Sequence, residues 1–184
     1  MRVCRLIATG LVTAAISVSG QANEIGDDAR AFVEGKYSDV LKSEVLLDAI
    51  DAQNAKHAGL VQTEIDALDK RWRADDDALI DPILANAVSA YLKKVVERSE
   101  GAFSEIFVMD NKGLNVGQSA KTSDYWQGDE AKWIETFTKG AIHIGDVEED
   151  ESTQTFQVQV SWPLKRDGEI VGAITFGIDV AALE

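Results

Sequence analysis

The hydrophobic pattern of the chain changes its period near Gly101, and this change restricts the possible folds more than any other feature. Before Gly101 the apolar residues recur at helical spacing, whereas after it they alternate with polar residues and β-branched and aromatic residues become frequent. We therefore predict an α+β fold, in which long N-terminal helices pack on a PAS-like antiparallel sheet of about five strands. Residues 23–80 are expected to form a helical segment and residues 81–184 the sheet part of the same domain.

Three helices are predicted in the first part of the chain. One covers residues 38–56, and a second begins at Thr63, whose hydroxyl can cap it. The third begins at Asp81-Pro82, because an N-cap acid followed by proline at the first helical position is a typical start signal. It is expected to end before Gly101, which follows the last apolar residue of the helical pattern as a C-cap does.

Two hairpins and one separate strand are predicted in the second part. The first hairpin turns at Asp-Asn-Lys-Gly, residues 110–113, and the closing hairpin turns at Lys-Arg-Asp-Gly, residues 165–168. The closing turn is rich in residues that tolerate positive φ. The expected strands are residues 104–109, 114–119, 141–147, 153–164 and 169–179.

The first 22 residues have the order of a secretory signal peptide. Arg2 and Arg5 precede an apolar run of about 13 residues, too short to span a bilayer of roughly 30 Å, and small and polar residues follow it up to Ala22. We expect cleavage near Asn23 and a periplasmic or secreted protein. Cys4 is removed with such a peptide, and the remaining chain then offers no thiol for catalysis or for zinc.

Charge and motifs exclude several classes of function. The net charge of −14 becomes −16 when Arg2 and Arg5 are removed, which disfavours nucleic acid and anionic membranes as partners. No serine elbow, phosphate loop or His-Glu zinc motif is present, and His57 and His143 lack neighbours at metal-ligand spacing. The acidic run at residues 146–151 lacks the pattern of a calcium loop, which favours a solvated turn. We expect neither an enzyme nor a bound cofactor or metal.

The element order and two sequence stretches resemble Cache domains, also called PDC domains, the extracellular relatives of the PAS fold in bacterial chemoreceptors and histidine kinases. One stretch is Glu-Ile-Phe-Val-Met-Asp-Asn-Lys-Gly at residues 105–113. The other combines Ser-Trp-Pro-Leu at residues 161–164 with Asp-Gly-Glu-Ile-Val-Gly-Ala-Ile at residues 167–174. The resemblance covers roughly residues 81–183, and the earlier helices are similar to the long N-terminal helix of the family.

This resemblance implies a domain that binds or senses a small polar metabolite, such as an amino acid, an amine or a carboxylate. No membrane helix is expected after the last strand, so we expect signalling through a separate membrane partner, such as a sensor kinase or chemoreceptor. The alternative is a ligand-free accessory protein that docks on a membrane sensor kinase or transporter. Related sensors also suggest a homodimer formed through the N-terminal helices.

In Cache relatives the region between the second and third strands closes the ligand pocket. In this sequence that region includes residues 122–133. Its aromatic residues can form flat walls and its aspartates can bind a cationic or hydroxyl group. Alternation along residues 153–164 places two glutamines and a serine on one face, directed either to the pocket or to solvent. The alternative interpretation of Trp133 is that it is a core residue of a short helix and does not contact a ligand. The candidate ligand-binding residues are Asp124, Tyr125, Trp126, Asp129, Trp133, Gln157, Gln159 and Ser161.

Overall fold

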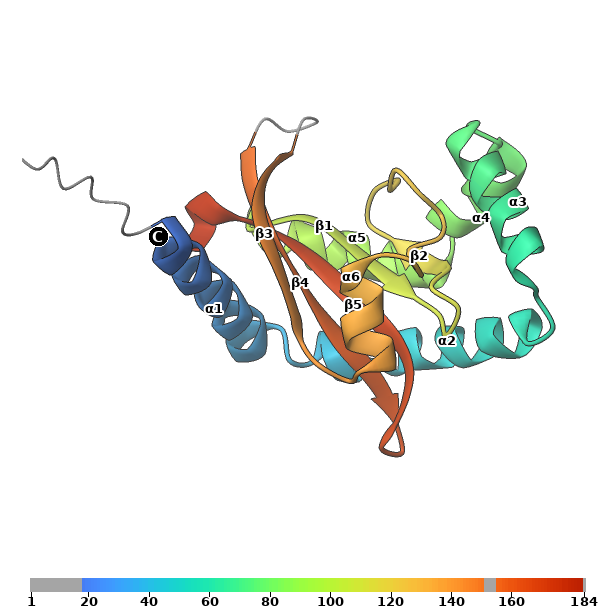
Figure 1. Cartoon of the computed structure of the whole chain (residues 1–184), viewed down its shortest axis with the longest axis horizontal. Helices are drawn as coiled ribbons and strands as arrows, with labels where there is room; N and C mark the ends of the chain where they lie inside the picture. The colour runs from blue at the N-terminus through green and yellow to red at the C-terminus, as the bar shows by residue number, and fades with distance from the viewer. Residues whose placement is uncertain (1–17, 151–154, 184) are drawn as a thin grey trace, which may run out of the picture.

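The computed structural model describes residues 18–150 and 155–183 of the chain (Figure 1). The helices are α1 (Val18–Lys36), α2 (Glu44–His57), α3 (Gln62–Arg73), α4 (Asp77–Leu84), α5 (Ala87–Glu97) and α6 (Ala131–Trp133). The strands are β1 (Phe103–Met109), β2 (Asn115–Gln118), β3 (His143–Asp150), β4 (Thr155–Arg166) and β5 (Glu169–Asp179). Short helical turns occur at η1 (Val40–Lys42), η2 (Ile134–Thr138, a π-helical turn that continues α6) and η3 (Val180–Leu183).

The five strands form one antiparallel sheet in the order β2-β1-β5-β4-β3, so the first and last parts of the strand region meet at its centre (Figure 1). The β4–β5 hairpin turns at Asp167 and Gly168, whose φ angles are 52° and 90°. Two positive φ angles are what a two-residue hairpin loop requires to match the strand twist. The predicted α+β fold with a five-stranded antiparallel sheet is confirmed.

Helices α1, α2 and α5 cover one face of the sheet, while α6 lies over the other (Figure 1). The main core forms on the helix-covered face because the apolar residues of each strand alternate toward it. In β4 these residues are Val158, Val160 and Trp162, and in β5 they are Ile174, Phe176 and Ile178. The opposite face of the sheet carries fewer apolar and more polar side chains.

A smaller second core lies beside β2, where α3 and α4 meet the loop that follows that strand. Trp72 of α3 is fully buried there and stacks on Tyr125, with ring centroids 5.3 Å apart and planes at 20°. The indole N–H of Trp72 donates to the carbonyl of Thr122 at 2.8 Å. This core therefore holds the beginning of the segment that leads to α6.

Two predicted helix starts are wrong. The helix expected to begin at Asp81-Pro82 is divided in two: α4 begins at Asp77, with Pro82 inside it, and α5 begins after Asn86. Asp76 caps α4 by accepting from Ala78 N–H at 3.1 Å, so the effective cap lies five residues before Asp81. Helix α3 begins at Gln62, and the carboxylate of Glu64 rather than the Thr63 hydroxyl satisfies its first turn.

Helix α1 begins at residue 18, within the predicted signal peptide. Residues 1–17 of that peptide lie outside the described residues, and residues 18–22 form the first turn and a half of the helix. Across residues 18–150 and 155–183, no helix combines the length and the apolar character that a membrane span needs.

Candidate functional site

The sheet face opposite the main core is polar where it follows β4. Gln157, Gln159 and Ser161 point to this face, as alternation along the strand predicts. Ser161 is buried and bonds to the hydroxyl of Thr175 at 2.8 Å, so its polar atom is already satisfied by the protein. Gln159 donates to the carboxylate of Glu105 at 2.8 Å and lies closer to the open part of the face.

Gly177 of β5 makes room for these polar groups. A Cβ atom at this position would lie 2.6 Å from the Ser104 hydroxyl and 2.7 Å from the Gln157 amide oxygen. The Ser104 hydroxyl donates to that same Gln157 oxygen. The missing side chain therefore allows a hydrogen-bonded row from β1 to β4 to cross the sheet at Gly177.

A pocket of about 310 Å³ opens between this face and the start of α6, and we call it the first pocket. Edge strand β3 forms one wall, β4 forms the floor, and the residues that begin α6 form the other wall. Its polar lining residues are Glu130, Lys132, His143, Asp146, Glu148, Gln157 and Gln159.

Carboxylates outnumber ammonium groups in the first pocket. Glu130, Asp146 and Glu148 contribute three acids, against one lysine among the lining residues. That lysine, Lys132, is already paired with Glu130 at 2.8 Å, and its ammonium group lies 5.4 Å from the centre of the Phe107 ring. The remaining carboxylates on β3 are open to a positively charged group that enters the pocket.

His143 lines the first pocket, and its pKa in the folded chain differs from its usual value. Burial lowers its pKa below the usual 6.5, with nearby Lys132 acting in the same direction and the carboxylates of Glu135 and Asp146 opposing it. The folded chain therefore binds this proton less readily than the unfolded chain. The contribution of His143 to the free energy of unfolding is therefore fully present above about pH 6.5, and it is lost as the pH falls toward the lowered pKa.

We expect the stability advantage of the wild type over a His143→Gln variant to decrease between pH 7 and pH 5. Urea unfolding at both pH values measures the difference, and comparison with the variant cancels the titration of the carboxylates. A difference that stays constant, or that grows as the pH falls, would contradict the direction of the shift.

A second pocket of about 250 Å³ lies between α3 and the loop after β2. Asp124, Trp126 and Asp129 line it, and Glu130 lines both pockets. Two of its acids already have a cation from the protein, because Arg73 pairs with Asp69 at 2.7 Å and approaches Asp124 at 3.7 Å. The second pocket has more carboxylates than the first, five against one arginine, but that arginine already lies between two of them.

Asp69 explains the shape of the loop at the second pocket. Its side chain is buried, and one carboxylate oxygen accepts from the backbone N–H groups of Tyr125 and Trp126 at 2.9 and 3.1 Å. The Tyr125 ring consequently points into the second core, where burial, with a smaller contribution from the charge of Asp110, raises the pKa of its hydroxyl well above 10. Tyr125 contributes to the packing and does not line either pocket.

Trp133 lies on the polar face of the sheet but against its apolar patch. It packs on Phe107, Met109 and Ala173, and its ring stacks on Phe137 with centroids 4.9 Å apart. Its indole N–H donates to the backbone carbonyl of Asp110 at 3.0 Å. Trp133 therefore anchors α6 on the sheet, next to the residues that form a wall of the first pocket.

The structure does not gather the eight predicted residues into one pocket. Gln157 and Gln159 line the first pocket, whereas Asp124, Trp126 and Asp129 line the second. The other three are Tyr125 in the second core, Trp133 on the apolar patch of the sheet, and Ser161 bonded to Thr175. Among the described residues, no three His, Cys, Asp or Glu side chains are grouped closely enough to bind a metal ion.

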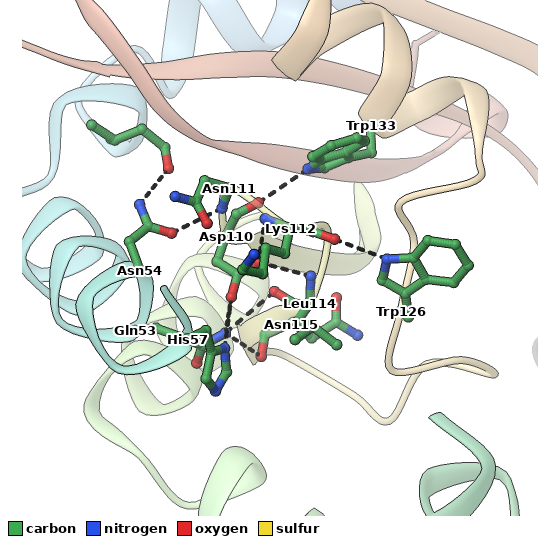
Figure 2. Close-up of polar contacts among 11 residues, drawn as sticks. Gln53, Asn54, His57, Asp110, Asn111, Lys112, Leu114, Asn115, Trp126 and Trp133 are labelled. Carbon is green, nitrogen blue, oxygen red and sulfur yellow. Dashed lines mark hydrogen bonds and ion pairs between the residues drawn. The ribbon is translucent and has the colours of Figure 1, made fainter. Parts of the chain in front are cut away.

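Sequence analysis missed a buried polar network at the 110–113 turn (Figure 2). Asp110 is fully buried, and its carboxylate accepts from Gln53 at 3.0 Å and contacts His57 Nδ1 at 2.9 Å. Its other oxygen accepts from the backbone N–H groups of Lys112 and Leu114 at 2.8 and 2.9 Å. The Asp-x-x-Gly turn was the only signal for this network, because its partners on α2 lie more than fifty residues away in the chain.

Comparisons with known proteins identify sensor domains as similar structures. No protein-family model matches the chain, and no curated protein matches its sequence. The sensor domain of the histidine kinase DctB from V. cholerae is 16% identical over 90% of this chain, with a TM-score of 0.49. The ligand-binding domain of the amino acid chemoreceptor PctC from Pseudomonas aeruginosa PAO1, solved with GABA, is 13% identical over 90% of this chain, with a TM-score of 0.41.

The sensor domain of DcuS from E. coli is 15% identical over 66% of this chain, with a TM-score of 0.39. This chain spans 55% of the DctB domain and 61% of the PctC domain, but 90% of the DcuS domain. All three neighbours are sensor or ligand-binding domains.

Proposed function

We propose that this chain, with the α+β fold expected of a Cache-type sensor domain, binds a small polar molecule that carries an ammonium group in the first pocket. The observation that supports this proposal is the charge of the lining, where three carboxylates face one lysine that is already paired. An amino acid or a small amine fits this charge better than a dicarboxylate. The volume of about 310 Å³ is at the lower end of the range for small-molecule sites.

The lining residues divide into two roles. Asp146 and Glu148 on β3 supply charge-assisted hydrogen bonds to the ammonium group. Gln157 and Gln159 on β4 offer amide donors and acceptors to neutral parts of the ligand. For an amino acid, Lys132 and the neutral His143 stand on the same pocket and can contact the ligand carboxylate.

The first pocket is preferred over the second because an arginine already lies among the acids of the second, and because only the first combines carboxylates with neutral amide groups, those of Gln157 and Gln159. Arg73 occupies the space between Asp69 and Asp124, so a cationic ligand in the second pocket has to compete with a side chain that the protein already holds there. In the first pocket, the lysine among the lining residues is paired with Glu130, which leaves the acids on β3 for the ligand.

Export and a membrane partner complete the proposal. The support for export is the order of charged, apolar and small residues in positions 1–22. In the proposed scheme the exported domain binds its ligand outside the cytoplasm and a separate membrane sensor kinase or chemoreceptor responds to the occupied form. The alternative, a ligand-free accessory protein, remains the interpretation to adopt if the binding experiment fails.

We expect compounds with an ammonium group to raise the melting temperature of the purified protein. At a ligand concentration of about 100 times Kd, the stabilisation is about 2.7 kcal/mol, which corresponds to a shift of roughly 5 to 10 °C for a domain of this size. A thermal-shift panel of L-amino acids, linear amines such as putrescine, and dicarboxylates such as succinate measures it. Stabilisation by dicarboxylates alone, or by no compound in the panel, would contradict the proposal.

A further inference from the structure

The 110–113 turn is held from two sides by different parts of the chain (Figure 2). From one side, α2 contributes Gln53 and His57 to the Asp110 carboxylate. Asn54 of the same helix accepts from the N–H of Asn111 at 2.9 Å and donates to the carbonyl of Val171 at 2.8 Å. Positions 53, 54 and 57 lie on one side of a helix, so α2 presents a continuous polar surface to the turn.

From the other side, two tryptophans of residues 122–138, which we call the covering segment, bond to the same turn. The Trp126 indole N–H donates to the carbonyl of Lys112 at 2.8 Å, and the Trp133 indole N–H donates to that of Asp110 at 3.0 Å. Both bonds end on backbone carbonyls of the turn. The position of the turn therefore determines where both indoles can bind.

The contact between the turn and the covering segment leaves little freedom for sliding. A Cβ atom added to Gly113 would lie 2.5 Å from the Cα of Gly128, so the two backbones touch directly. Gly113 also has a φ of 82°, a conformation that glycine adopts without strain. The turn and the covering segment are thus packed backbone to backbone where Trp126 reaches over Lys112.

The His57–Asp110 contact completes the connection to α2. The Asp110 carboxylate already receives a donor from Gln53 and two backbone N–H groups, so it acts as an acceptor and His57 Nδ1 as the donor. Both side chains are buried, with side-chain exposures of 8% and 0%. A buried, fully satisfied network of this kind holds one geometry, because an unpaired member costs free energy.

We propose that Asp110 and His57 are positioning residues of the first pocket, which place the covering segment and couple its position to α2. The link to the pocket is short, since Glu130 and Lys132 line it and Trp133 follows directly. A shift of Trp133 moves both residues, and by reciprocity closure of the pocket over a ligand acts on α2 through the same bonds. The relevance of this coupling to sensing rests on the proposed function, but the bonds themselves are testable without any ligand.

The chain suits a direct spectroscopic test, because it has four tryptophans and two histidines. Two indoles, Trp126 and Trp133, bond to the turn, whereas the Trp72 indole bonds to Thr122. In ¹⁵N-labelled protein, a His57→Leu variant is expected to move the indole signals of Trp126 and Trp133 and to increase their solvent exchange at least tenfold. The signal of Trp162, on β4, is expected to stay in place, and that of Trp72, which bonds to the start of the covering segment, is expected to move less than those of Trp126 and Trp133.

Two further variants separate positioning from general loosening. His57→Asn keeps a donor near the position of Nδ1 and is expected to restore the Trp126 and Trp133 signals. Ser99→Ala removes another buried hydrogen bond, from the Phe103 N–H to the Ser99 hydroxyl, and is expected to leave all four indole signals unchanged. In the reverse direction, Trp133→Phe is expected to shift the ring signals of His57.

Unchanged Trp126 and Trp133 signals in His57→Leu, or equal movement of all four indoles, would overturn the coupling. Such a failure leaves the ligand proposal standing, because the thermal-shift panel does not depend on it. Conversely, a panel without any stabilising compound, together with the expected indole shifts, would overturn the proposed function and retain the connection between α2 and the covering segment.

Discussion

Replacing Asp110 with alanine is expected to lower the free energy of unfolding by about 4 kcal/mol. The side chain is fully buried and accepts from four donors, two on the backbone of its own turn and two on α2. Alanine removes the acceptor of all four donors. The contacts of His57 and Leu114 are buried, whereas those of Gln53 and Lys112 are half-buried, and Gln53 keeps its contacts with the carbonyls of Leu114 and Asn115. Urea unfolding at neutral pH, with the slope of the transition checked against the wild type, measures the loss.

Asp110→Asn is the matched control for this prediction. Its amide oxygen can still accept from the two backbone N–H groups of the turn, while its NH₂ group faces His57 and Gln53, so about half of the loss is expected. A loss below about 1 kcal/mol in Asp110→Ala would contradict the central position of this residue in the fold. Equal losses in the two variants would show that the α2 contacts, rather than the turn, dominate.

Replacing Trp72 with alanine is also expected to cost about 4 kcal/mol, since truncation of a fully buried tryptophan leaves a large cavity. The effect is expected to concentrate in the loop after β2, because Trp72 stacks on Tyr125 and bonds to the Thr122 carbonyl. Amide hydrogen exchange, read segment by segment, is expected to show lost protection in residues 119–130 before the central strands.

Trp72→Phe tests the two contributions separately. Phenylalanine preserves most of the stacking on Tyr125 but removes the hydrogen bond, so the Thr122 carbonyl is left without this donor and a loss of about 1 to 2 kcal/mol is expected. If Trp72→Ala loosened β4 and β5 as much as the loop, the second core would not be the separate unit that its contacts indicate.

The strands were predictable from sequence because their signals are local. Alternation over residues 153–164 and 169–179, together with a turn that ends in Asp-Gly, determines both the strands and their pairing. It also placed Gln157 and Gln159 correctly on one face. The start of α4 was predicted wrongly because Asp81-Pro82 matches the typical signal, while burial of Ile80 and Ile83 in the second core favours a helix that continues through Pro82.

The arrangement of the site was only partly predictable because it depends on contacts between distant parts of the chain. The loop residues Asp124, Tyr125 and Trp126 are adjacent in sequence, yet Asp69 on α3 turns the loop so that Tyr125 points into the core. The sequence of the loop itself does not indicate that Asp69, on α3, accepts hydrogen bonds from it. The partnership of His57 with Asp110 is hidden for the same reason, since each residue alone is an ordinary member of a helix or a turn.

The most direct test of the account is isothermal titration of the best ammonium compound from the panel into the wild type and two matched variants. Asp146→Asn neutralises an acid of the first pocket, and Asp66→Asn neutralises an acid of the second. We predict that Asp146→Asn weakens binding at least about tenfold, equivalent to about 1.4 kcal/mol, and that Asp66→Asn leaves Kd within about twofold of the wild type. Loss of binding in Asp66→Asn with unchanged binding in Asp146→Asn would contradict the assignment of the ligand to the first pocket.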